Sequence, residues 1–388
     1  MLALLGGTLW CGLVLYLLSR ALRQFRIFRR AALPAANPSA VLSAVSVIVP
    51  VRDEIANIDV CLAGLSAQSG LSGPWSIIVV DDGSEDNTRS AALRHAAVDQ
   101  RITVVDAGPL PAGWMGKPHA CWRGAELAEG EWLCFVDADV RAAPGLVAAA
   151  VTAAEMHGTD MLSLQPLQEL GSFWERLVIP VGLLVLACAK PFALASPEVV
   201  NGQFLLIRRE AYFASGGHRH VRAQICEDRA LAARLQAQGF ALEVLAAEHL
   251  ARTRMYRDLP SLWEGFSKNA TEALGSLRGT LTAAAAALVF GWAALLMPLA
   301  TLVGVRAEPS PAAFVGCILA FVGTGIVIAV HLGTARHFRI PPAFTATFAL
   351  GCTAVACLAC HAVIRRIEGC VTWKGRTYRL GNMSSDGT

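Results

Sequence analysis

Charged residues are scarce in this chain. Of its 388 residues only 16% are charged, whereas 54% are hydrophobic. Soluble domains carry about 25% charged residues, so the composition excludes an ordinary cytosolic enzyme. It predicts a protein with membrane segments beside a soluble domain.

The cysteines also lack an informative pattern. Eleven are present, but their spacing matches neither a disulfide framework nor a zinc site. Cys357 and Cys360 form a C-x-x-C pair inside an apolar run, where small packing residues are the better interpretation. This use of cysteine is compatible with a reducing cytoplasm.

Basic residues are not interleaved with aromatics on a soluble face, which argues against nucleic-acid binding. They form two clusters beside apolar runs: Arg20, Arg23, Arg26, Arg29 and Arg30 in one, and Arg365, Arg366, Lys374, Arg376 and Arg379 in the other. We interpret both clusters as contacts with anionic lipid headgroups.

Four segments are expected at the membrane. Residues 1–19 have no charged side chain and the arginines follow them, which predicts a retained anchor rather than a cleavable signal peptide. Residues 20–44 are expected to be a basic juxtamembrane linker. A C-terminal transmembrane region is expected over 281–364, with spans at 281–305, 312–332 and 343–364.

These spans predict a multi-pass protein of the cell (inner or plasma) membrane with its catalytic domain in the cytoplasm. Three crossings would place the basic tail, residues 365–388, outside, whereas its charge argues for the inside. One of the three segments is therefore a candidate re-entrant or interfacial helix. Residues 178–189 are too short to span and predict an interfacial or core helix.

Between residues 45 and 277, short apolar runs alternate with amphipathic stretches, and no repeat or low-complexity tract interrupts them. This pattern predicts an α/β domain with a mainly parallel sheet. The expected strands are 45–49, 77–80, 102–105, 132–136, 161–164 and 204–207. The expected helices are 54–67, 87–97, 118–128, 144–156 and 227–238.

Carboxylates follow two of the buried strands. Asp81-Asp82-Gly83-Ser84 comes after one, and Asp137-Ala138-Asp139 after another. Ligands of parallel sheets bind beyond the carboxyl ends of the strands. Strand alternation would place Asp137 and Asp139 on one face, where their mutual repulsion favours a hard cation, Mg²⁺ or Mn²⁺, bridging a diphosphate.

Other polar residues are candidates for the same site, each with a plain structural alternative. Pro50 and Glu54 after the first strand could line a nucleotide pocket or only end a strand and begin a helix. Glu227-Asp228 opens a helix, where acids are favoured in any case. Lys117 follows flexible glycines that suit phosphate contact, although a surface lysine has the same pattern.

Taken together and in this order, the motifs resemble those of membrane-bound family 2 glycosyltransferases of the GT-A fold. The resemblance rests on V-S-V-I-V-P-V-R-D-E, V-V-D-D-G-S, G-W-M-G-K-P-H-A, F-V-D-A-D and C-E-D within residues 45–277. The chain is similar within that family to enzymes that glycosylate isoprenoid lipids such as carotenoids and hopanoids. M-Y-R, W-E-G-F-S-K-N and W-K-G-R fit this narrower group.

The resemblance implies roles for these residues. Asp82 would bind the nucleotide base, Asp137 would lie at the ribose or metal, and Asp139 would be the metal ligand. Asp228 would be the catalytic base and Lys117 would lie near the diphosphate. The residues expected on the acceptor side are Glu227, Trp263, Lys268 and Asn269.

The implied reaction is inverting transfer of one sugar from a nucleotide-sugar donor, with UDP expected, to a lipid acceptor. Processive polysaccharide synthases carry Q-x-x-R-W after the base, and this chain has W-E-G-F-S-K-N there instead, which argues against polymer synthesis. A membrane nucleotidyl- or phosphosugar transferase is an alternative, as is a non-catalytic nucleotide-sugar-binding protein.

Overall fold

The computed structural model describes residues 1–35, 43–189 and 195–379. The chain divides into two compact units. The first contains Met1–Arg26, Leu170–Pro191 and Tyr256–Val371, and the second contains Ile27–Glu169, Phe192–Met255 and Thr372–Thr388. Each unit is described separately.

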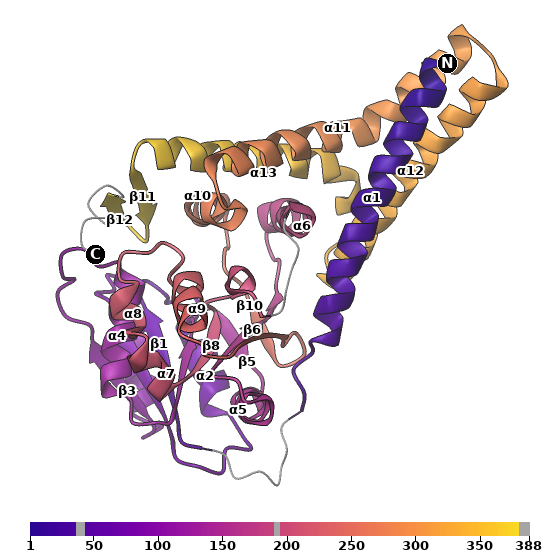
Figure 1. Ribbon diagram of the computed structural model, residues 1–388. Coiled ribbons are helices and arrows are strands. Elements are labelled where there is room, and N and C mark those ends of the chain that lie inside the picture. The colour runs from indigo at the N-terminus through magenta and orange to yellow at the C-terminus, as the bar shows by residue number, and fades with distance from the viewer. Residues whose placement is uncertain (36–42, 190–194, 380–388) are drawn as a thin grey trace. The chain divides into compact units, whose positions relative to one another are not determined.

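A seven-stranded sheet with the order β3-β2-β1-β4-β8-β6-β9 forms the centre of the second unit (Figure 1). All pairings are parallel except those of β8, which is antiparallel to β4 and β6. The predicted mainly parallel sheet is thus confirmed. Its strands are β1 (Val45–Val51), β2 (Trp75–Asp81), β3 (Ile102–Asp106), β4 (Trp132–Val136), β6 (Met161–Gln165), β8 (Phe204–Arg208) and β9 (Leu242–Ala246).

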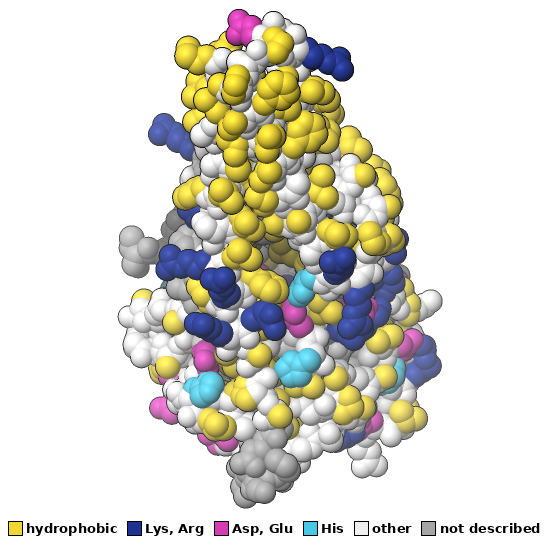
Figure 2. All heavy atoms as spheres, turned by 90° about the vertical axis from the view of Figure 1, so that its right-hand side faces the viewer, with side chains coloured by type: hydrophobic (Ala, Val, Ile, Leu, Met, Phe, Trp, Pro, Cys, Tyr) yellow, Lys and Arg dark blue, Asp and Glu magenta, His cyan; other side chains and the backbone are white. Residues whose placement is uncertain are grey.

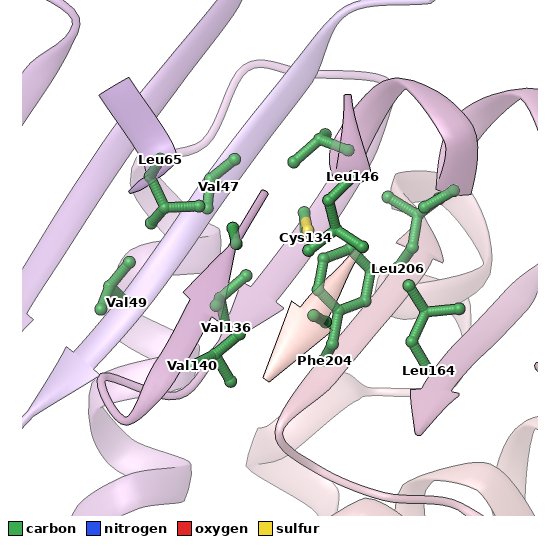
Figure 3. Close-up of a cluster of buried hydrophobic side chains, with 14 of the residues drawn as sticks. Val47, Val49, Leu65, Cys134, Val136, Val140, Leu146, Leu164, Phe204 and Leu206 are labelled. Carbon is green, nitrogen blue, oxygen red and sulfur yellow. The ribbon is translucent and has the colours of Figure 1, made fainter. Parts of the chain in front are cut away.

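Helices cover this sheet because its strands are apolar on both faces. One buried cluster joins Val47 and Val49 of β1 with Cys134, Phe204 and Leu146 (Figure 3). The helices of this unit are α2 (Ile58–Ser66), α3 (Thr88–Ala96), α4 (Gly116–Leu127), α5 (Leu146–His157), α7 (Arg209–Ala214), α8 (Gly217–His220), α9 (Glu227–Ala237) and the 3₁₀ turn η1 (Pro197–Val199).

Two smaller sheets complete the unit. The first has the order β5-β10-β7, with β5 (Val140–Ala142), β10 (Ala251–Thr253) and β7 (Leu167–Gln168). The second is the hairpin β11–β12, formed by Cys370–Trp373 and Arg376–Arg379. The strands of these two small sheets and β9 were not predicted from the sequence.

The first unit consists of long apolar helices. Four are long and apolar enough to cross a membrane: Leu2–Arg30, Leu277–Ala307, Pro311–His337 and Pro342–Ile367. They correspond to α1, α11, α12, and η2 (Pro342–Thr347) followed by α13 (Phe348–Ile367); α6 (Phe173–Ala189) and α10 (Leu259–Leu274) complete the unit.

Apolar side chains lie exposed on these helices, as expected for surfaces that face lipid (Figure 2). Gly7 and Gly316 let the backbones of α1 and α12 approach closely, because a Cβ on either glycine would meet main-chain atoms of the other helix. Such small-residue contacts are typical of membrane helix pairs. Together with the four apolar helices, they support a membrane protein.

Several helix and unit boundaries of the structure differ from those of the expected segments. Residues 20–30, expected in a linker, continue α1 to Arg30, and Leu33 donates to the carbonyl of Ala246 beside β9 at 2.8 Å. Residues 36–42 of that linker lie outside the described residues. Within the expected domain 45–277, residues 170–189 and 256–277 cluster with the apolar helices instead, whereas residues 372–379 of the expected tail cluster with the sheet.

Candidate active site

The candidate site lies at the carboxyl edge of the central sheet. β1, β2 and β4 are parallel and end at this edge, at Val51, Asp81 and Val136. The antiparallel β8 begins there, since Phe204 pairs with Val136. Loops that are distant in sequence therefore meet, as parallel sheets require.

Asp82 is buried just beyond β2, and an arginine from the C-terminal hairpin holds it. Arg376 donates from Nη1 to Asp82 Oδ2 at 2.5 Å and from Nη2 to the Asp82 carbonyl at 3.1 Å. The other carboxylate oxygen, Oδ1, is buried and has no hydrogen-bond partner among the described residues. Burial raises the pKa of Asp82, and the Arg376 hydrogen bond and charge oppose that rise.

Glu54 is held by the same hairpin. Lys374 Nζ lies 2.8 Å from Glu54 Oε1 and also donates to the carbonyls of Arg52 and Asp53. Arg52 in turn donates to the Asp82 and Gly83 carbonyls at 2.8 Å each. The loops after β1 and β2 are therefore joined through the hairpin.

These contacts correct our interpretation of the basic tail. Lys374 and Arg376 were assigned to lipid headgroups, but both pair with carboxylates at the sheet edge. Their partners lie some three hundred residues earlier in the chain, so no local pattern could identify them. The W-K-G-R motif was the available signal.

Lys117, at the start of α4, bridges two acidic segments. Its Nζ lies 2.8 Å from Asp137 Oδ1 and 3.1 Å from Glu227 Oε1. Burial disfavours the ammonium, but the charges of the two carboxylates outweigh it and raise the pKa of Lys117 well above its usual value. Lys117, Asp137 and Glu227 thus form one ionic cluster.

Asp139 has a different environment from Asp137. We had predicted the two aspartates on one face of a strand. β4 ends at Val136, however, so both lie in the turn between β4 and β5. Burial, followed by the charges of Asp137 and Glu54, raises the pKa of Asp139 to about 7. Its Oδ1 is buried without a partner among the described residues, while Thr253 of β10 forms a hydrogen bond with the carboxylate.

The environment of Asp139 fits a divalent cation. No group of three or more acidic, histidine or cysteine side chains suited to a metal occurs in the described part of the chain. A cation here would therefore rely on Asp139, with Asp137 beside it and oxygens of a bound ligand completing its shell. Hard oxygen donors of this kind suit Mg²⁺ or Mn²⁺.

Asp228 lies on the first turn of α9, half-buried. Its Oδ2 accepts a hydrogen bond from the Gly202 amide at 2.7 Å and its Oδ1 accepts one from the Arg229 amide at 2.8 Å. Burial and the charge of Glu227 raise the pKa of Asp228. A carboxylate oriented by two amides, with a raised pKa, is suited to general-base work.

Gly202 belongs to a polar loop that leads into β8. Asn201 donates to Gln165 Oε1 at 3.2 Å and to Gln203 Oε1 at 3.0 Å, and Gln203 donates to Thr253 Oγ1 at 2.9 Å. The Gln203 carbonyl accepts from the Asp137 amide at 3.0 Å. This amide network links the Asp228 side of the site to the Asp139 side.

The structure thus brings together Glu54, Asp82, Lys117, Asp137, Asp139, Glu227 and Asp228 in one unit. Pro50 lies within β1 beside Val80. Trp263, Lys268 and Asn269 lie on α10 of the other unit, where Trp263 donates to His361 Nδ1 at 3.1 Å. Their acceptor-side role stays a prediction.

Comparison with known proteins agrees with this geometry. Residues 46–177 match the family described as Glycosyl transferase family 2. A 4,4'-diaponeurosporenoate glycosyltransferase of Staphylococcus aureus (strain MRSA252) is 30% identical over 264 residues, which cover 66% of this chain and 68% of the relative.

Among solved structures, the chain is similar to the mannosyltransferase PcManGT from Pyrobaculum calidifontis, solved in complex with GDP-Man and Mn²⁺. The TM-score is 0.54 at 19% identity, covering 94% of this chain and 99% of that one. At this identity the likeness supports the fold, which is of the GT-A type.

Proposed function

The chain belongs to glycosyltransferase family 2, and from that premise we propose that it transfers one sugar from a UDP-linked donor to a lipid at the membrane. The relative in Staphylococcus aureus is named for transfer to 4,4'-diaponeurosporenoate. Four apolar helices accompany the catalytic unit here. A carotenoid-type or other isoprenoid lipid with a carboxylate or hydroxyl is therefore the proposed acceptor.

The observation that carries this proposal is the division of the carboxylates at the sheet edge. Buried Asp82 and half-buried Asp139 each have one buried carboxylate oxygen, Oδ1, without a hydrogen-bond partner among the described residues, and Asp228 is oriented by two amides. The first suits a nucleobase, the second a cation, and the third an acceptor proton. Glu54 and Pro50 would line the nucleotide side of the site.

Asp139, with Asp137, would hold Mg²⁺ or Mn²⁺, which supplies charge stabilisation for a departing diphosphate. Lys117 would lie near that diphosphate, while its ion pairs with Asp137 and Glu227 hold both carboxylates in position. Asp228 would take the proton from an acceptor hydroxyl or orient an acceptor carboxylate. Attack opposite the leaving group then inverts the anomeric centre.

Turnover of the purified full chain in nanodiscs tests this proposal, with a UDP-sugar, Mn²⁺ and a carotenoid acid as substrates. We expect release of free UDP and a product mass increased by one sugar. Asp228→Asn should lower kcat at least ~100-fold, the scale of general-base loss, and leave donor binding intact. Glu243→Gln on β9, whose partner is His157, is the control and should stay active.

Two results would contradict the proposal. A product that keeps a phosphate would indicate a nucleotidyl- or phosphosugar transferase, and near-normal turnover of Asp228→Asn would exclude it as the base. Mass spectrometry of lipid extracts from cells with and without the gene would then identify the sugar and the acceptor together.

A further inference from the structure

The hairpin β11–β12 is built in a way that a plain chain end does not require. Its two-residue turn, Lys374-Gly375, has positive φ at both positions, 50° and 73°. Such turns match the twist of a hairpin but favour glycine, asparagine or aspartate. Lys374 adopts this backbone while its ammonium is held by Glu54 and two carbonyls, a strain typical of functional segments.

Arg376 of the hairpin contacts one of the two carboxylate oxygens of Asp82. Arg376 occupies Oδ2, and Oδ1 remains buried without a partner in the described residues. Gly116 leaves room for this pair, because a Cβ there would collide with Asp82 Oδ2 and Arg376 Nη1. The Gly116 amide also lies 3.4 Å from the Tyr378 hydroxyl of the same hairpin.

We propose that Arg376 is a specificity-determining residue of the donor site, which takes one oxygen of Asp82 and leaves the other for a single N–H of the donor's base. The inference rests on the proposed function and on Asp82 as the base contact. Uracil offers one such N–H, at N3. Guanine presents two adjacent donors, at N1 and N2, which pair best with both oxygens of a carboxylate.

A buried polar atom left unpaired weakens binding, so the preference between bases depends on how many N–H donors each base presents to Asp82. With Arg376 in place, uracil satisfies Oδ1, whereas the second N–H of guanine would have to share Oδ2 with the Arg376 guanidinium, whose positive charge opposes a further donor there. Arg376 also keeps Asp82 charged and oriented. The other charged or titratable groups facing this carboxylate are Arg52 and His119.

The test measures nucleotide binding to the full chain in nanodiscs at fixed Mn²⁺, by calorimetry with UDP and with GDP. Arg376→Ala should weaken UDP binding about tenfold or more and GDP binding less, so the UDP-to-GDP preference falls. Arg376→Lys, which keeps a cation, should retain part of the preference. Arg379→Ala is the matched control, since this exposed arginine of the same strand forms no ion pair with an acidic site residue in the described part of the chain, and the variant should bind nucleotide like the wild type.

Other outcomes would overturn the inference. Tighter UDP binding in Arg376→Ala would indicate that the hairpin inhibits binding, and unchanged UDP binding would indicate that its role is only structural. Equal loss for UDP and GDP would place Arg376 at the diphosphate. A thermal melt shows whether each variant is folded. If Arg376→Ala is unfolded, the UDP-to-GDP preference of Arg376→Lys tests the inference instead.

These readouts separate the inference from the proposed function. If the wild type binds UDP but transfers no sugar to any lipid, the proposed function fails while the binding ratios still judge Arg376. If the wild type binds neither nucleotide, both fail.

Discussion

Gly202 offers a specific test of the site, because it packs so closely against Asp228 that a side chain at position 202 would collide with the carboxylate. A methyl group added at Gly202 would meet Asp228 Oδ2 at 3.1 Å, Cβ at 3.2 Å and Cγ at 3.3 Å, whereas ordinary contact begins at 3.4 Å. Gly202→Ala should therefore displace the Asp228 carboxylate by a few tenths of an ångström. The φ of Gly202 lies outside the left-handed region that disfavours alanine, so the expected effect is steric.

The expected kinetic effect follows from that displacement. Misplacing a reacting group by about 1 Å costs about 100-fold. A shift of about a third of that distance should lower kcat about fivefold, or about 1 kcal/mol of activation free energy. The KM for the UDP-sugar should stay the same, because the three atoms nearest to the Gly202 methyl all belong to Asp228.

A double-mutant cycle shows whether Gly202 acts through Asp228. If it does, Gly202→Ala combined with Asp228→Asn should be no slower than Asp228→Asn alone. Steady-state UDP release under saturating donor and acceptor measures all four proteins. Gly325→Ala in α12, where a Cβ has nothing within 4 Å, is the control. Multiplying losses in the double variant, or a raised donor KM instead of a lowered kcat, would refute the reasoning.

Three further predictions follow from charged groups. Lys117→Met should raise the donor KM about tenfold. It should also lower the melting temperature more at pH 8 than at pH 5.5, because protonation at the lower pH relieves the unpaired carboxylates of Asp137 and Glu227. Equal loss of melting temperature at both pH values in scanning fluorimetry would contradict this prediction. The pKa of Asp139 is raised to about 7, so protons should compete with Mn²⁺ and Mn²⁺-dependent UDP binding should weaken below that pH, whereas Asp139→Asn should abolish the Mn²⁺ dependence altogether. Burial lowers the pKa of His218 to about 4, so the folded form binds fewer protons than the unfolded chain, and stability should be lost as pH falls from about 6.5 toward 4, by up to about 3 kcal/mol. His218→Gln should flatten that dependence in pH-resolved melts, and an unchanged slope would contradict the assignment.

The strands of the central sheet could be predicted because each is a continuous apolar run, the pattern of a strand buried on both faces. The carboxylates Asp82, Asp137 and Asp228 could be predicted for a related reason, since they stand at the ends of such runs or at a helix start. The rule that these ends share an edge then brings them together. β9 was missed because Glu243 interrupts its short apolar run.

The rest of the site depends on contacts that sequence patterns do not encode. The partners of Lys374 and Arg376 lie at the other end of the chain, and lysine and arginine beside an apolar segment look the same whether they bind lipid or protein. The importance of Gly202 comes from its distance to Asp228, which no sequence pattern encodes. The α1 boundary was missed because a helix leaving an apolar span carries arginines without ending.

The hairpin also constrains how many times the chain can cross the bilayer. Lys374 and Arg376 bind Glu54 and Asp82 within one unit, so both ends of the intervening chain must be on the same side of the membrane. That chain must therefore cross an even number of times, although it contains three helices long and apolar enough to span. Pro342–Ile367 has the largest buried share of its apolar window, 44% against 28% for each of the other two. It is therefore the least suited to face lipid on all sides. An even number of crossings agrees with the expectation that one of the three C-terminal segments is a re-entrant or interfacial helix.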